Sequence, residues 1–156
     1  MVLAALLYQI KNLAARPAVM AQLLRTDSFT RTTILAVDDE VTVLELMVET
    51  LTDMGYDTLS ATGAESALAL MKDHPSVDLL VTDVRMPEMS GVDLAHAARH
   101  CRPHMPVVFV TGYAAEFQSG ARQALPGSRM LTKPFSMDKF GRTVKEMICQ
   151  SRSSGA

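Results

Sequence analysis

The sequence predicts an α/β protein in which the five strands of a mostly parallel sheet alternate with five helices. Short apolar runs rich in β-branched residues recur along the chain, and a segment with helical spacing of its apolar residues follows each run. Strands that alternate with helices form crossover units, which place helices on both faces of a parallel sheet. The runs are almost continuously apolar, which is typical of strands buried on both faces.

The predicted elements follow one another from residue 32 onward. Strands are expected at 33–37, 56–59, 79–82, 107–110 and, with a weaker pattern, 130–131. Helices are expected at 41–54, 64–72, 91–100, the poorly patterned 114–124, and 137–150. Gly55, Gly63 and Pro75 stand where helices should begin or end, because glycine and proline interrupt a helical pattern.

The two ends of the chain differ from the segment between them. Apolar residues within 3–14 have helical spacing, which Pro17 interrupts. Residues 1–31 are therefore expected to form an extension that is helical or disordered. The alternative is a helix for docking or dimerisation, and a dimerisation helix would make the protein a homodimer. A signal peptide is disfavoured because no positive charge precedes the apolar stretch. Residues 151–156 predict a disordered tail, which leaves 32–150 as the folded domain.

Composition narrows the class of protein. A chain of 156 residues, 48% hydrophobic and 21% charged, is the size and balance of one soluble domain. The net charge of −2 provides no basic surface for nucleic acid, so no nucleic-acid partner is expected. Cys101 and Cys149 lack the spacing of a zinc site or a disulfide framework, which favours reduced thiols in a cytoplasmic protein. No apolar run approaches the roughly 18 residues of a membrane span.

Polar residues stand at the ends of four of the apolar runs. They are Asp38, Asp39 and Glu40 after the first run, Asp83 after the third, Thr111 after the fourth and Lys133 after the fifth. Ligands of open parallel sheets bind beyond the carboxyl ends of the strands, so these side chains are expected to converge. Each one alone could be a helix cap or an ordinary surface residue. Together they suit Mg²⁺-dependent phosphoryl chemistry: carboxylates hold the cation, one carboxylate attacks phosphorus, and a lysine and a hydroxyl offset charge on the phosphoryl oxygens.

The same residues lie in four ordered motifs that resemble the response-regulator receiver family over about residues 32–149. The first motif, 34–40, is similar to the first strand and acidic pair of the family, and 83–91 to its phosphoacceptor loop. The segment 108–112 resembles the switch strand, and 131–135 the lysine-proline-phenylalanine motif. The resemblance implies a flavodoxin-like, doubly wound (βα)5 fold whose five-stranded parallel sheet has the order 2-1-3-4-5.

The resemblance also implies a role for each matching residue. Asp83 is the phosphoacceptor, and Mg²⁺ is held by Asp38, Asp39, Asp83 and the backbone carbonyl of Arg85. Thr111 and Lys133 contact the phosphoryl oxygens, Gly112 leaves room beside the phosphodonor, and Pro134 follows a cis peptide bond. One position departs from the family: Met130 stands where an aromatic residue usually reports phosphorylation. Tyr113 is the nearest aromatic residue that could substitute in part.

The function expected from this resemblance is that of a signalling module rather than an enzyme. The motifs look most like receivers of hybrid sensor kinases, so the partner is expected to be a sensor histidine kinase or a histidine phosphotransfer protein. No length remains after residue 150 for an output domain, which predicts a stand-alone or separated receiver. One alternative is a degenerate receiver that binds partners without phosphorylation. A less favoured one is an aspartyl-phosphate phosphatase, which would need a second acid where Arg85 stands.

Overall fold

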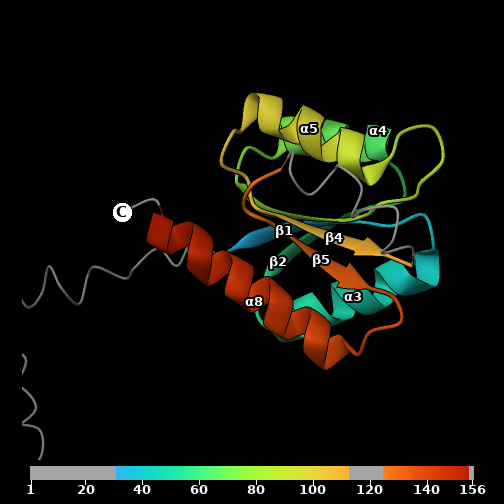
Figure 1. The fold of residues 1–156 in the computed structure, drawn as a ribbon, viewed down its shortest axis with the longest axis vertical. Helices are drawn as coiled ribbons and strands as arrows, with labels where there is room; N and C mark the ends of the chain where they lie inside the picture. Colours follow the sequence, from blue (N-terminus) through green and yellow to red (C-terminus); the bar gives the residue numbers. More distant parts are fainter. Residues whose placement is uncertain (1–30, 113–124, 155–156) are drawn as a thin grey trace, which may run out of the picture. The chain divides into compact units, whose positions relative to one another are not determined.

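The computed structural model describes residues 31–112 and 125–154, which belong to one compact unit (Figure 1). Five strands form a single parallel sheet in the order β2-β1-β3-β4-β5. The strands are β1 Thr33–Val37, β2 Asp57–Ala61, β3 Val77–Asp83, β4 Val107–Thr111 and β5 Ser128–Thr132. This topology confirms the predicted doubly wound fold. The extension up to residue 30, Tyr113 and the helix expected at 114–124 lie outside the described residues.

The described helices form a layer on each face of the sheet. Helices α4 (Ala64–Asp73) and α5 (Gly91–Cys101) lie over one face, and α3 (Val41–Asp53) and α8 (Met137–Ser154) over the other (Figure 1). Within the described ranges, no helix is both long enough and apolar enough to cross a membrane. The sheet is thus enclosed between two helical layers, as the crossover pattern predicts.

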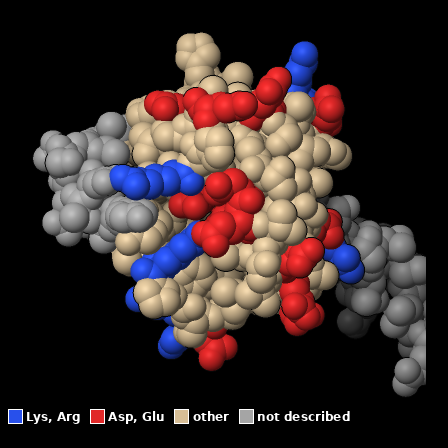
Figure 2. Space-filling view, turned by 90° about the vertical axis from the view of Figure 1, so that its right-hand side faces the viewer, with Lys and Arg blue, Asp and Glu red and all other residues tan. Residues whose placement is uncertain are grey.

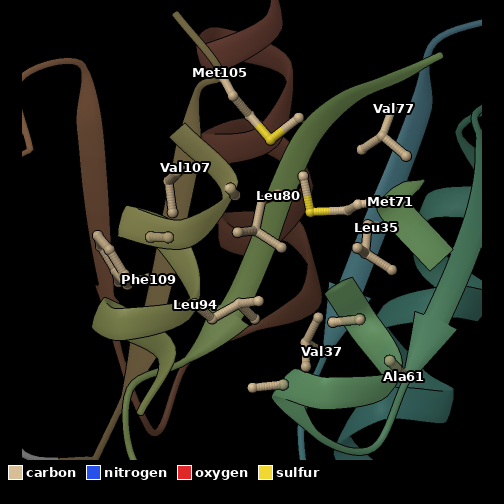
Figure 3. Close-up of a cluster of buried hydrophobic side chains, with 14 of the residues drawn as sticks. Leu35, Val37, Ala61, Met71, Val77, Leu80, Leu94, Met105, Val107 and Phe109 are labelled. Atoms are coloured by element: carbon tan, nitrogen blue, oxygen red, sulfur yellow. The ribbon is translucent and has the colours of Figure 1, made fainter. Parts of the chain in front are cut away.

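Each helical layer packs on its own buried cluster of apolar side chains. On the α4 and α5 side, Leu35 and Leu80 from the central strands meet Leu94 of α5 (Figure 3). On the opposite side, Ile34 packs in a cluster with Phe140 of α8. Because successive residues of a strand point to opposite faces, and both faces are covered, β1 is buried along nearly its whole length. This double coverage is the physical reason for the continuous apolar runs.

Strand β3 begins at Val77, two residues before its predicted start. Asp78 interrupts the apolar pattern, but its Oδ2 accepts a hydrogen bond from the backbone N–H of Thr33 at 2.8 Å. The pairing of β1 with β3 shifts register between Thr33 and Ile34. The Asp78 side chain therefore accepts a hydrogen bond from a backbone N–H at the irregular end of the β1–β3 pairing. This contact allows an acidic residue within a central strand.

The last helix continues past its predicted end. Helix α8 reaches Ser154, so the prediction of a disordered tail is wrong for residues 151–154. Arg152 donates a hydrogen bond from Nη2 to Oγ1 of the buried Thr32 at 2.7 Å. A polar contact of this kind fixes the final turn to the start of the sheet, and a search for apolar periodicity does not detect it.

The topology brings the ends of β1 and β3 together. These strands are neighbours although β2 separates them along the chain, so the strand order reverses between them. Val37 pairs with Thr82, which places the following residues, Asp38 and Asp83, side by side at the carboxyl end of the sheet. Such a reversal leaves a crevice for ligands beyond the strand ends.

Candidate functional site

Three carboxylates meet at the carboxyl ends of β1 and β3. One oxygen each from Asp38, Asp39 and Asp83 lies within 4.8 Å of the other two. Asp38 and Asp83 are buried, whereas Asp39 is exposed. Figure 2 looks onto this end of the sheet and shows acidic side chains gathered near the centre, with basic side chains beside them. Hard carboxylate oxygens so close together fit a divalent cation such as Mg²⁺.

Asp38 is the most constrained of these acids. Its side chain is fully buried, and Oδ1 accepts a hydrogen bond from the backbone N–H of Glu40 at 2.9 Å. Burial raises the pKa of Asp38, and the nearby Asp83 adds to that effect. The Glu40 N–H and the Lys133 ammonium act in the opposite direction without cancelling it. A cation bound beside Asp38 would offset the cost of burying its ionised carboxylate, which is a further reason to expect one at this site.

Lys133 brings the positive charge from the end of β5. Its Nζ lies 3.0 Å from Asp38 Oδ2, 3.3 Å from Glu40 Oε1 and 3.5 Å from Asp83 Oδ2. Burial alone lowers the pKa of Lys133, but the acidic partners, Asp38 foremost, outweigh it and hold that pKa above its ordinary value. The Lys133 backbone N–H donates to the carbonyl of Thr111 at 2.8 Å, and the peptide bond to Pro134 is cis. Lys133 is thus charged and held at the mouth of the pocket.

The loop after Asp83 is shaped by a close backbone approach. Oδ1 of Asp83 accepts from the backbone N–H of Arg85 at 3.3 Å, and the N–H of Gly91 donates to the carbonyl of Val84 at 2.9 Å. A Cβ at Gly91 would lie 1.8 Å from the carbonyl oxygen of Asp83, so no other residue fits there without a shift. Glu88, within the loop, has a positive φ of 69°, which is uncommon for a residue other than glycine. Sequence reasoning placed Gly91 in the motif but assigned it no role.

The remaining residues singled out from the sequence occupy three different settings. Thr111 is buried at the end of β4, where it pairs with Thr132. A Cβ at Gly112 would meet no described atom within 4 Å. Met130 is half-buried, pairs with Phe109 and packs against the cluster under α4 and α5. The backbone carbonyl of Arg85 remains a predicted ligand only.

One contact of the pocket was missed by sequence reasoning. Glu40 was identified as a strand-end acid, but only Asp38 and Asp39 of that acidic run were given roles. The structure adds Glu40 as a partner of Lys133, across 93 positions of the chain. No local pattern signals this ion pair, because it depends on how β5 lies relative to the turn after β1.

This parallel sheet of order 2-1-3-4-5 is shared with solved response regulator receiver domains: one from Methanospirillum hungatei JF-1 superposes with a TM-score of 0.74 at 27% identity, covering 80% of this chain and 98% of that one. The model of the response regulator receiver domain matches residues 34–145, and the chain belongs to this family.

Relatives and solved structures agree with this assignment. The chain is 36% identical over 124 residues to the sensor kinase CckA of Brucella abortus (strain 2308), which covers 79% of this chain and 13% of the kinase. It is 30% identical over 115 residues to the response regulator receiver protein CpdR of the same organism, covering 74% of this chain and 95% of CpdR. A receiver protein structure from Sinorhizobium medicae WSM419 superposes with a TM-score of 0.71 at 32% identity, covering 80% of this chain and 99% of that one.

The raised pKa of Asp38 predicts how stability responds to a substitution. An acid whose pKa is raised by folding contributes stability below its unfolded pKa, and this contribution is lost as pH rises through the folded pKa. At neutral pH the ionised Asp38 is therefore destabilising in the metal-free protein. Asp38→Asn is expected to raise the free energy of unfolding, measured by urea titration at pH 7.5 in the presence of a chelator.

Mg²⁺ should stabilise the wild type more than the Asp38→Asn variant. At about ten times its dissociation constant, Mg²⁺ is expected to stabilise the wild type by about 1.4 kcal/mol. Asp38→Asn should lose most of that gain, whereas Asp73→Asn, which removes an exposed carboxylate on α4, should keep it. If Mg²⁺ stabilises Asp38→Asn as much as the wild type, Asp38 is not a ligand of the metal.

Proposed function

We propose that the protein accepts one phosphoryl group on Asp83 in a Mg²⁺-dependent reaction, and that this modification changes its affinity for a partner. The observation that carries the proposal is the position of the Asp83 carboxylate. It lies at the switch point of the sheet, beside two other carboxylates and 3.5 Å from the Lys133 ammonium. This is a nucleophile with a cation site and a fixed positive charge around it.

The transfer step needs little from the protein besides position and charge. An oxygen of Asp83 forms a bond to phosphorus while the bond from phosphorus to a histidine nitrogen of the donor breaks. The electron pair of that broken bond leaves with the imidazole. Asp38, Asp39, Asp83 and the backbone carbonyl of Arg85 would hold Mg²⁺, which supplies positive charge to the phosphoryl oxygens. Lys133 and the Thr111 hydroxyl take further phosphoryl oxygens, and Gly112 leaves space for the donor.

The switch would start from the charge that the transfer adds. A phosphoryl group brings up to about two negative charges to a pocket that is already acidic. Lys133 and Thr111 are joined by a backbone hydrogen bond of 2.8 Å, so movement at the phosphoryl group is passed to the ends of β4 and β5. Met130 lies one strand position away from the buried Leu131, and we propose that it repacks in place of the usual aromatic residue.

The likeness to CckA and CpdR supports a place in a phosphorelay. We propose a sensor histidine kinase or a histidine phosphotransfer protein as the donor, and the cytoplasm as the compartment. Cys101 and Cys149 are both exposed and unpaired as disulfides, which suits a reducing environment. The chain spans 13% of the length of CckA and 95% of that of CpdR, so it corresponds to the receiver part of such proteins.

Intact-protein mass spectrometry tests the proposal directly. After incubation with acetyl phosphate and Mg²⁺, the protein should gain the mass of one phosphoryl group, and a chelator should prevent the gain. Hydroxylamine should reverse it, because acyl phosphates react with this nucleophile. A folded protein that gains no mass from acetyl phosphate or from a phosphorylated kinase would instead favour a receiver that binds partners without phosphorylation.

A further inference from the structure

Lys133 contacts one acid, Glu40, that has no role in the proposed transfer. An ammonium group has three N–H donors. Carboxylate oxygens of Asp38, Glu40 and Asp83 lie 3.0, 3.3 and 3.5 Å from Lys133 Nζ, so three acids share one ammonium group. The oxygens of a phosphoryl group on Asp83 would therefore compete with Asp38 and Glu40 for Lys133.

Glu40 is the partner that can give way. Asp38 is held on both sides, because its side chain is fully buried and its Oδ1 accepts the Glu40 N–H at 2.9 Å. Asp83 is itself the proposed acceptor. The Glu40 side chain is 65% exposed, and although Glu40 is the N-cap residue of α3, its side chain makes no capping hydrogen bond with that helix. Its carboxylate is therefore not needed to begin the helix and is free to rotate away from Lys133.

We propose that Glu40 is a positioning residue that also selects phosphodonors by their charge. Its carboxylate lies 3.3 Å from Lys133 Nζ, the group that the phosphoryl oxygens would bind, so it holds the ammonium until transfer. The same negative charge repels a donor in proportion to the donor's own charge. This inference rests on the proposed function, since it concerns the approach of a donor to Asp83.

Coulomb's law sets the size of the effect. With donor and carboxylate several ångströms apart in a largely aqueous setting, removing one charge should speed the reaction about threefold per unit of donor charge at low ionic strength. Glu40→Gln should therefore raise the rate about tenfold for a donor with two negative charges and about threefold for a donor with one. Salt near 1 M, where the screening length is about 3 Å, should remove most of this difference.

The test compares two small donors. Acetyl phosphate carries two negative charges near neutral pH, whereas the protonated nitrogen of phosphoramidate leaves that donor with one. In both reactions an Asp83 oxygen bonds to phosphorus, and the electron pair of the broken bond leaves with acetate or with ammonia. Initial rates of phosphorylation would be measured by intact-protein mass in Mg²⁺, for wild type and Glu40→Gln, at low and high salt.

Two further variants separate charge selection from simple disturbance of the pocket. Glu45→Gln removes an exposed acid from the same helix and should leave the ratio of the two rates unchanged. Glu40→Asp keeps the charge on a shorter side chain and should keep a ratio close to that of wild type. The expected result is a rate ratio, acetyl phosphate over phosphoramidate, that rises about threefold in Glu40→Gln alone.

Other outcomes would overturn the inference in recognisable ways. Equal changes with both donors in Glu40→Gln would mean that the substitution merely loosens the pocket, and an equal rise in Glu45→Gln would mean a general surface-charge effect. In both cases the wild type is still phosphorylated, so the proposed function stands. If no folded variant gains mass from either donor or from a phosphorylated kinase, the proposed function fails and this inference fails with it.

Discussion

Replacing Asp83 with asparagine is expected to abolish the phosphoryl mass gain, a loss of at least about 100-fold in rate, because a carboxamide oxygen is a poor nucleophile for phosphorus. The substitution is nearly isosteric, and an asparagine oxygen can still accept the Arg85 N–H that Asp83 Oδ1 accepts at 3.3 Å. The fold should therefore remain intact. The measurement is intact-protein mass after incubation with acetyl phosphate and Mg²⁺, with unfolding in urea as the check on folding.

Asp73→Asn is the matched control for this experiment. Asp73 is an exposed residue at the end of α4, so the change removes one carboxylate without touching the pocket, and the mass gain should persist. A gain that persists in Asp83→Asn would place the phosphoryl group elsewhere. Peptide mapping would then decide between Asp38 and Asp39, the other two carboxylates of the cluster.

Gly91→Ala is expected to lower the free energy of unfolding by about 3 kcal/mol, because overpacking against rigid backbone forces the surroundings to move. The new Cβ would lie 1.8 Å from the carbonyl oxygen and 2.8 Å from the carbonyl carbon of Asp83, and 2.8 Å from Thr82 Oγ1. These atoms belong to the last two residues of β3, not to the far end of a flexible side chain. Asp83, the proposed phosphoacceptor, must shift, so the rate of phosphorylation should fall as well.

Gly63→Ala provides the comparison for the effect of adding a methyl group. Gly63 precedes α4 with extended backbone, and a Cβ there would meet no described atom within 4 Å. The expected loss of stability is below about 1 kcal/mol, which reflects only the poorer helix-capping preference of alanine. Both variants would be measured by urea unfolding and by initial rates with acetyl phosphate. Equal free energies of unfolding for Gly91→Ala and Gly63→Ala would show that the first turn of α5 can move away from β3 at no cost in stability.

Much of the fold could be predicted because the central strands carry a strong signal. Helices cover both faces of β1, β3 and β4, so their sequences are almost continuously apolar and their positions were found to within about two residues. Strand β5 lies at the edge of the sheet and has only one buried residue, Leu131, which explains its weak pattern. The turn at 151–154 was missed because Arg152 fixes it through a polar contact with Thr32.

The sequence alone predicts that Asp38, Asp83 and Lys133 lie together, and the structure brings these three side chains into contact. Asp83 ends its strand, Asp38 and Lys133 directly follow theirs, and the carboxyl ends of parallel strands lie along one edge of a sheet. The order of the strands, implied by the resemblance, then placed the first two acids side by side. These predictions need no knowledge of side-chain positions, because the backbone alone sets where each strand ends and at which edge of the sheet that end lies.

How those side chains divide their contacts depends on the packing of distant segments against one another. The third acid on Lys133 is Glu40, 93 positions away along the chain. The two meet because the Lys133 side chain extends from the end of β5 to the residues that follow β1, across the ends of two intervening strands. Likewise, the need for glycine at position 91 depends on how closely α5 approaches the backbone of Asp83. Both facts depend on separations of a few ångströms between distant segments, and such distances are set by packing rather than by local sequence.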